Sequence, residues 1–497
     1  MSELEIPGDS PETNREASPE GASKPEGEAL DEIRVNAKAK SVVLDKETID
    51  YIEKHPQKLR SLILRLALPA VAENVLATAT QMADMIMVGR LGASAIAGVG
   101  LSNQPLFFIQ GLFMGIGVGT TVIVARLYGA SRKSEADHVA QQSLIFTFLL
   151  SAVLCSIWYG LVPQVISFMG AKDDVIPLAL SYMRTLVPGL FLLTLNIAMS
   201  SALRGAGDTR SPMIANTTIN IINIFGNYVL IFGHLGLPAM GVTGAALSTT
   251  ISRGIGTAIL LYIMSGGRGV LQLRLSDGLK PDSSTLKRVL KVGIPTAAER
   301  VSLSLGITFY TRIVASLGTV TFAAHQIALN AEQISYMPGF GFATAATALV
   351  GQALGAGNKK MAEKSGWNAW KMSAWLSGVM GLVLLILPEK LMGLYVSDPE
   401  IIRMGALSLR IMGIAQVPMS AGFTIVGALR GAGDTKAVLY LTLISVWGVR
   451  LIGTWFAVQV LHLGLMGAWL VMALDWCTRA VVSIMRWKSG HWKNRKV

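Results

Sequence analysis

The heptapeptide Leu-Arg-Gly-Ala-Gly-Asp-Thr occurs twice in this chain, at residues 203–209 and again at residues 429–435. The shift in sequence number that carries residue 203 to residue 429 is called the repeat offset below. The same offset, without a gap, relates further pairs of identical residues, among them Pro69 and Pro295, Glu73 and Glu299, and Arg184 and Arg410. Chance similarity between apolar segments would not hold one register over such a length. The chain therefore consists of two copies of one unit.

Long apolar segments that are nearly free of charge recur through both copies. A helix needs roughly 20 apolar residues to cross a bilayer core of about 30 Å. Only 15% of the residues are charged, against about 25% in an average soluble domain. We expect twelve membrane-spanning helices, at about residues 60–87, 95–126, 138–160, 175–203, 212–233, 241–264, 287–314, 321–353, 366–387, 399–428, 437–460 and 466–487.

Each copy holds six of these helices, an even number, so both copies enter the membrane in the same direction. The expected fold is an all-α membrane protein with two parallel six-helix lobes, related by a pseudo-twofold axis along the membrane normal. Residues 57–264 form the first lobe, residues 265–286 a connecting loop and residues 287–487 the second lobe. This architecture is typical of secondary transporters, which bind substrate between the halves near the bilayer midplane.

Basic residues predict the orientation of the bundle, because cytoplasmic loops of membrane proteins carry an excess of Lys and Arg. Most lie in the loops on one side, and the opposite side has few, namely Arg90, Lys172, Arg312, Lys390 and Arg403. We therefore expect a multi-pass plasma-membrane protein with both termini and the connecting loop in the cytoplasm. The net charge of +12 then reflects these loops and does not indicate a nucleic-acid partner.

The two ends of the chain differ from the apolar bundle. Residues 1–40 contain ten acidic and five basic residues and have almost nothing to bury, which predicts a disordered tail. Residues 41–57 are expected to form a short amphipathic lead-in at the membrane surface, so that residues 1–56 precede the first lobe. Residues 488–497 form a basic cytoplasmic tail. No charged and apolar pattern of a cleaved signal peptide is present.

Ionisable residues inside a membrane are costly and mark functional sites. The acids at membrane depth are few: Glu73, Asp84, Glu299, Glu332 and Asp475. Glu73 and Asp84 are eleven residues apart, or three helical turns, and so share one helix face. A carboxyl group in a dry site is easier to protonate, which suits the loading and release of an ion. Asp84, Glu299 and Glu73 are therefore candidates for ion coupling or substrate binding.

A structural role is the alternative for each of these acids. Glu299 is adjacent to Arg300, and Asp475 lies one turn before Arg479, so either acid can form an ion pair. Glu332 and Asp475 are assigned this structural role.

A stripe of amides lies on the fifth helix. Asn220, Asn223 and Asn227 recur at about one turn, and Asn216 precedes them. Amides in a membrane helix often hydrogen-bond to neighbouring helices. Three on one face, in a chain with few polar helix residues, favour the lining of a cavity.

Further residues have weaker patterns. Met82 and Met419 can offer an adaptable lining for apolar ligands, although ordinary packing explains either of them equally well. Gln326 follows His325 near the start of the eighth helix. The repeated turn is interpreted as structural, with Asp208, Thr209 or Ser211 capping the next helix. Its glycines lack the spacing of a phosphate-binding loop.

Several motifs, taken together and in order, resemble the multidrug and toxic compound extrusion family of bacterial cation-coupled antiporters over about residues 60–485. They are Ala324-His325-Gln326-Ile-Ala-Leu, Met337-Pro338-Gly339-Phe340-Gly341, Gly351-Gln352-x-Leu-Gly355-Ala356-Gly357, Asn227-Tyr-Val-Leu-Ile-Phe-Gly233 and both repeated turns. The resemblance implies a V-shaped pair of lobes that alternates access and is driven by a gradient of H⁺ or Na⁺.

The resemblance also assigns residues. Asp84 matches the acidic position on the first helix that is implicated in proton coupling, and Asn223 matches a lobe-lining Asn. Asn227 stands where the family has an Asp. Glu299 matches a Glu that binds a cation in some members, and Met419 stands at the position of the Asp that accompanies it there. A Na⁺ site at Glu299 would lack this ligand, so the resemblance favours protons and Asp84.

The leading hypothesis is a secondary active multidrug efflux transporter that exchanges H⁺, or Na⁺, for small organic and often cationic compounds. We expect a monomer in the lipid bilayer, without cofactors and without catalytic activity. The alternative is a flippase for lipid-linked or polyisoprenoid-linked precursors, which would need a basic cavity for pyrophosphate. A membrane-embedded enzyme would need clustered catalytic residues at one membrane face, and the sequence shows none.

Overall fold

The computed structural model describes residues 42–169, 173–266, 270–273 and 280–495. The acidic stretch 1–40, Lys172 and parts of the loop expected at 265–286 lie outside these ranges.

Within the described residues, all twelve expected helices are present, and several run one or two turns beyond their expected bounds. The first copy contains α2 (Gln57–Gly89), α3 (Ala93–Gly129), α4 (Lys133–Phe168), α5 (Ile176–Gly205), α6 (Arg210–Phe232) and α7 (Gly241–Ser265). The second contains α8 (Ser283–Ala315), α9 (Thr319–Gly355), α10 (Lys359–Ile386), α12 (Pro399–Gly431), a four-part helix over 435–460, and α15 (Gly464–Lys488). Short helices are α1 (Lys46–Lys54), α11 (Pro388–Gly393) and η4 (His491–Asn494).

By length and composition alone, ten helices in the described part of the chain are apolar enough to cross a membrane. The two long helices outside this set are α8 and α9. The repeat offset relates them to α2 and α3, which do belong to the set, and they lie in the same bundle. Twelve membrane-spanning helices therefore describe the fold.

The helix expected at 437–460 is wound differently from the others. It consists of α13 (Thr435–Leu443), η2 (Ile444–Leu451), α14 (Ile452–Trp455) and η3 (Phe456–Val460). The η2 and η3 segments are π-helical, a wider winding that often occurs at functional sites. The η2 segment places Arg450, which is buried, inside the second lobe.

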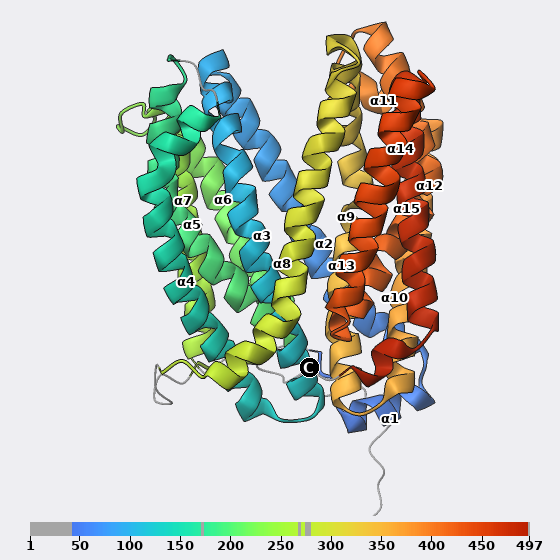
Figure 1. Ribbon diagram of the computed structural model, residues 1–497. Coiled ribbons are helices and arrows are strands. Elements are labelled where there is room, and N and C mark those ends of the chain that lie inside the picture. The colour runs from blue at the N-terminus through green and yellow to red at the C-terminus, as the bar shows by residue number, and fades with distance from the viewer. Residues whose placement is uncertain (1–41, 170–172, 267–269, 274–279, 496–497) are drawn as a thin grey trace, which may run out of the picture.

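The helices form two lobes that converge at one end and stand apart at the other (Figure 1). Helices α3 to α7 lie on one side, and α9 to α15 on the other. The first helix of each copy packs across the boundary, because α2 contacts α9 as well as α6, and α8 contacts α3 as well as α13. These matched contacts confirm two parallel copies related by a pseudo-twofold axis.

The lobes approach most closely at the end that carries the loops 129–133, 205–210, 355–359 and 431–435, called the basic end below. A Cβ on Gly129 would lie 1.8 Å from the carbonyl oxygen of Gln352, and one on Gly355 would lie 2.0 Å from that of Arg126. Glycine is therefore required for this contact. Arg126 Nη2 also donates to the carbonyl oxygen of Ala432 at 2.8 Å.

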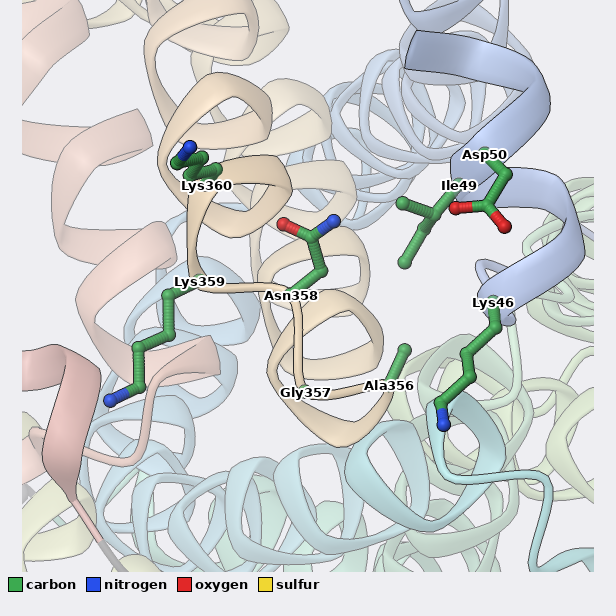
Figure 2. Close-up of a pocket in the computed structure, with 8 residues that line it drawn as sticks. All are labelled: Lys46, Ile49, Asp50, Ala356, Gly357, Asn358, Lys359 and Lys360. Carbon is green, nitrogen blue, oxygen red and sulfur yellow. The ribbon is translucent and has the colours of Figure 1, made fainter.

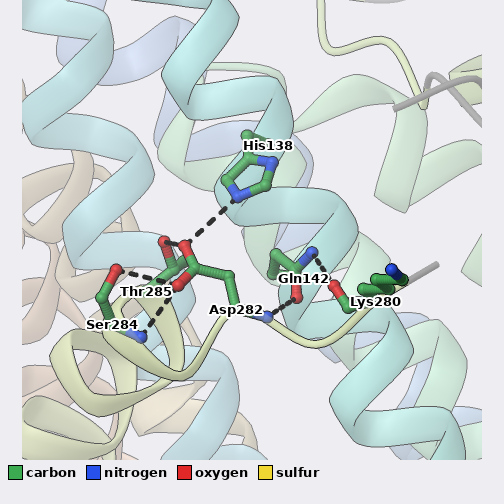
Figure 3. Close-up of polar contacts among 6 residues, drawn as sticks. All are labelled: His138, Gln142, Lys280, Asp282, Ser284 and Thr285. Atoms are coloured by element: carbon green, nitrogen blue, oxygen red, sulfur yellow. Dashed lines mark hydrogen bonds and ion pairs between the residues drawn. The ribbon is translucent and has the colours of Figure 1, made fainter. Parts of the chain in front are cut away.

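The segment before α8 is tied to α4 of the first lobe (Figure 3). Gln142 Nε2 donates to the carbonyl oxygen of Lys280 at 3.0 Å, and the Asp282 N–H donates to Gln142 Oε1 at 2.8 Å. Asp282 caps α8 by accepting from the Ser284 N–H at 2.9 Å, and His138 Nε2 lies 3.4 Å from its carboxylate. Hydrogen bonds from Thr285 and Ser284 hold the pKa of Asp282 well below its usual range.

Both ends of the described chain are packed against the bundle. Helix α1 is the short amphipathic helix expected before the first lobe, and its Ile49 and Ile52 are buried in a core cluster with second-lobe residues, while its place at the membrane surface stays a prediction. At the other end Trp492 is buried and stacks on Trp487, with ring centroids 3.9 Å apart. Residues up to Arg495 therefore fold onto the second lobe.

Candidate functional site

Helices α2 and α6 meet in a register that pairs each acid of α2 with an amide of α6. Asn216 Nδ2 donates to Glu73 Oε1 at 2.7 Å, and Asn227 Nδ2 donates to Asp84 Oδ1 at 2.6 Å. Glu73 and Asp84 are eleven residues apart on α2, and Asn216 and Asn227 are eleven residues apart on α6. Eleven residues are three helical turns, so the two acids and the two amides have the same spacing. The predicted carboxylate face of α2 and the amide stripe of α6 are therefore the same interface.

Asp84 lies in the middle of a small polar cluster in the first lobe. The Asn223 amide lies 3.0 and 3.2 Å from the two Asp84 carboxylate oxygens and 3.1 Å from the Thr249 hydroxyl. The amide orientation that satisfies both partners places the nitrogen on Asp84 and the oxygen on Thr249. Asn223 and Asn227 are buried, whereas Asp84 is half-buried. Two amide donors thus hold this carboxylate.

Charged and phenolic groups surround the cluster at longer range. Arg253 of α7 and Tyr182 of α5 lie within electrostatic range of Asp84. Neither residue was expected at the site from the sequence. The signal available was weak, because a single Arg or Tyr in an apolar helix has no partner nearby in sequence.

The other two candidate acids are held by arginines in a repeated arrangement. Arg204 Nη2 donates to Glu73 at 2.6 Å, and Arg430 Nη2 donates to Glu299 at 2.7 Å. Each arginine belongs to a copy of the repeated heptapeptide. Thr442 takes the position of Asn216 in the second copy and lies 3.2 Å from Glu299. The expected pairing of Glu299 with Arg300 is wrong, because the partner is Arg430.

A third buried cluster occupies the second lobe. Asp475 pairs with Arg450 at 2.6 Å and with Arg479 at 3.3 Å, and it also accepts a hydrogen bond from Ser445. The predicted pair of Asp475 and Arg479 is confirmed, whereas Arg450 was not expected. Glu332 is buried in the same lobe, within electrostatic range of Arg450.

The remaining candidates lie in different environments. Asn220 is half-buried on α6, and Met82 is 43% exposed on α2. Met419 is buried in the second-lobe core, and Gln326 is exposed on α9. The neighbouring His325 is fully buried and accepts a hydrogen bond from Trp469 Nε1 at 3.1 Å. Asp84, Asn223 and Asn227 are thus the candidates that the structure brings together.

The Asp84 cluster occurs in one lobe only. At the repeat offset, the second copy has Tyr310, Val449 and Gly453 in place of Asp84, Asn223 and Asn227. Among the described residues there is also no group of three His, Cys, Asp or Glu side chains that could hold a metal ion. The cluster is therefore a single-carboxylate site.

Comparison with known proteins identifies the family. The family model described as MatE matches residues 69–229 and again residues 295–456, together more than half of the chain. The two matched stretches begin at Pro69 and Pro295, which the repeat offset relates. The chain belongs to the MatE family, the multidrug and toxic compound extrusion (MATE) transporters.

Relatives and solved structures agree with this assignment. The MATE transporter is 36% identical to a Thermotoga maritima protein named "Probable multidrug resistance protein NorM", over 88% of this chain and 94% of the relative. A solved structure described as the outward-facing conformation of a multidrug resistance MATE family transporter matches with a TM-score of 0.81 and 27% identity, over 87% and 96% of the two chains. A MOP superfamily transporter from Pyrococcus furiosus, whose binding pocket is described as having reverse polarity, matches with the same TM-score and identity, over 87% and 95%.

The residues of the site lie within the two stretches that the family model matches. Asp84, Asn223 and Asn227 lie in the first matched stretch, and Glu299 and Arg430 lie in the second. The MATE transporter is a multi-pass membrane protein of a transporter family, and this points to transport and away from catalysis.

Proposed function

We propose that this MATE transporter extrudes small organic compounds, often cationic, from the cytoplasm in exchange for H⁺ that binds at Asp84. The protein would lie in the plasma membrane with its basic end in the cytoplasm. The names of relatives point to multidrug resistance. The observation that carries the proposal is the hydrogen-bonding of Asp84.

Asp84 is held by groups that suit both of its protonation states. As a carboxylate it accepts from the amide nitrogens of Asn227 and Asn223. Asn227 Oδ1 is buried, and no described residue donates a hydrogen bond to it. After rotation of the amide, this oxygen can accept the proton of a neutral Asp84 carboxyl group. The cluster therefore supports reversible binding of a proton.

The arginine-held acids lack this property. Glu73 and Glu299 each accept a hydrogen bond from a guanidinium group, which has no acceptor for the proton of a neutral carboxyl group. A Na⁺ ion at Glu299 would have to compete with Arg430. We therefore assign proton binding to Asp84 and a structural role to Glu73 and Glu299.

A cationic compound and a proton would compete for the same negative charge. Loading a proton removes the charge on Asp84, which weakens the attraction for a bound cation. A ligand shifts the equilibrium between two conformations only by its difference in affinity for them. Proton entry at one side and release of the compound at that side would thus be coupled.

The flippase alternative receives no support from the buried arginines of the second lobe. Arg450 and Arg479 both pair with Asp475. A pyrophosphate group would need basic side chains that are free to bind it.

The test is transport by the purified protein in liposomes under an imposed pH gradient or an imposed sodium gradient. A fluorescent organic cation should move against its gradient when the pH gradient alone is present. An ionophore that exchanges K⁺ for H⁺ should abolish this movement. Transport driven by sodium alone, and insensitive to that ionophore, would refute the proton assignment. A protein that transports no organic compound under either gradient would refute efflux.

A further inference from the structure

We propose that residues Val42–Leu44 form a latch that ties the two lobes together at the basic end, and that this end opens only when the latch leaves the first lobe. The proposal rests on the proposed function, because a transporter with alternating access must open this end. It concerns a segment outside the twelve membrane-spanning helices and outside both stretches matched by the family model.

The latch is a non-helical segment inserted between the lobes. Val42 and Leu44 belong to a core cluster with second-lobe residues such as Leu349 and Leu429. Val43 packs against a different cluster, most of whose members, such as Leu203 and Ala206, belong to the first lobe. The segment therefore contacts both lobes through alternating side chains, and Leu44 is fully buried.

Backbone hydrogen bonds attach the latch to both copies of the repeat. The Val42 N–H donates to the carbonyl oxygen of Gly207 at 3.1 Å, in the first repeated turn. The Leu44 N–H donates to Gln352 Oε1 at 3.0 Å, on α9 of the second lobe. Gln352 Nε2 in turn donates to the carbonyl oxygen of Gly205 at 3.2 Å. Latch, first turn and second lobe thus form one network, and Gln352 is fully buried within it.

The helix that follows the latch belongs to the second lobe. Asn358 Nδ2 donates to Glu53 Oε1 of α1 at 3.2 Å, and the side chains of Ile49 and Ile52 are buried against that lobe. An open cavity of about 430 Å³ separates part of α1 from the turn between α9 and α10 (Figure 2). If the lobes part at the basic end, α1 stays with the second lobe. Of the contacts that the latch makes, those that break are the contacts of Val42 and Val43 with the first lobe.

Glycine at position 207 makes room for the latch. Its φ of +83° suits glycine, and an added Cβ would lie 1.8 Å from the carbonyl oxygen of Val42. Gly357 has a φ of +79° at the same end of the bundle, and an added Cβ there meets nothing within 4 Å. An alanine at either position would have a strained backbone, because both φ angles are positive. Only Gly207→Ala would also displace the latch.

The experiment measures the separation of the lobes at the basic end directly. Spin labels are placed at Ser134→Cys on α4 and Lys364→Cys on α10, which are exposed on opposite lobes, with Cys155 and Cys477 replaced by Ser. Electron–electron resonance in lipid nanodiscs gives the populations with short and long distances. The compared proteins are the full chain, a chain starting at residue 42 and a chain starting at residue 45, each after an initiator Met.

The chain starting at residue 42 retains the latch and should match the full chain. The chain starting at residue 45 lacks three further residues, and its ratio of long to short distances should rise at least about fivefold, the change that one net hydrogen bond produces. Gly207→Ala in the full chain should raise the ratio in the same direction, and Gly357→Ala should not. Equal ratios in all these proteins would overturn the latch.

Transport in liposomes, measured on the same proteins, separates this proposal from the proposed function. If the ratios differ as expected but no protein transports organic cations, the latch stands and the function fails. If the full chain transports and the ratios are equal, the function stands and the latch fails.

Discussion

Arg430 and Glu299 form an ion pair of 2.7 Å across the second lobe. The repeat offset relates this pair to that of Arg204 and Glu73 in the first lobe. The Glu299 side chain is 5% exposed and that of Arg430 is 16% exposed. Removal of one partner from a buried pair leaves the other charge without compensation. The pair therefore holds α8 against the end of α12.

We predict that Glu299→Gln lowers the free energy of unfolding by about 3 kcal/mol, without changing which cation drives transport. Thermal unfolding in detergent and transport under pH and sodium gradients check the two parts. Glu389→Gln is the control, because its partner Arg410 forms a pair that is about half exposed, and such a pair contributes at most about 1 kcal/mol. A stable Glu299→Gln protein that has lost a response to sodium would contradict the structural role.

We predict that Asn227→Ala reduces proton-driven transport at least tenfold. The substitution removes the 2.6 Å hydrogen bond to Asp84, and a bond to a charged group contributes about 1.5–3 kcal/mol. Asn220→Ala, two turns away on the same helix, is the control and should transport normally. Initial rates of cation uptake into acidified vesicles measure both. Normal transport by the Asn227→Ala protein would show that the amide does not serve the site.

The outcome of sequence-based prediction differed between the helices and the contacts between them. The apolar segments and the repeat offset predicted twelve helices and the equivalence of Glu73 and Glu299, because both follow from local composition and register. The sequence did not reveal that Arg204 and Arg430 are their partners. The expected helices end before these arginines, at about residues 203 and 428, so the sequence places both among the loop charges used to predict orientation, whereas in the structure they lie in the last turns of α5 and α12.

The repeated turn shows the same limit. Capping of the helix after the first turn was predicted, and Asp208 does accept from the Ser211 N–H at 2.9 Å. In the second turn the equivalent Asp434 instead pairs with Arg486 at 2.7 Å. The two identical turns thus make different contacts, because residues 42–44 lie beside the first turn and the C-terminal segment that carries Arg486 lies beside the second. The place of residues 42–44 between the lobes depends on such tertiary contacts and has no signal in the local sequence.

We predict that Gly129→Ala and Gly355→Ala each weaken closure of the basic end. An added Cβ would lie 1.8 Å or 2.0 Å from a carbonyl oxygen of the opposite lobe, so the backbones must separate. The spin-label ratio of long to short distances should rise severalfold. Gly160→Ala in α4, where an added Cβ meets nothing within 4 Å, should leave the ratio unchanged. Unchanged ratios in both glycine variants would mean that the lobes do not meet at these residues.

We predict that Asp282→Ala lowers the melting temperature at neutral pH by a few degrees, because α8 loses its cap. The folded pKa of Asp282 lies below its unfolded value, so its stabilising effect is complete above about pH 4 and is lost as the pH falls further. The difference between the wild-type and Asp282→Ala proteins should therefore shrink in stronger acid. A difference that grows with falling pH would contradict this sign.

The release of protons on addition of an organic cation tests the central claim most directly. The purified protein in weakly buffered detergent solution is mixed with the cation, and a pH-sensitive dye records the protons set free. The wild-type protein should release protons, whereas Asp84→Asn should release almost none and should no longer use a pH gradient for efflux. Full proton release together with full efflux by the Asp84→Asn protein would contradict coupling through this carboxyl group.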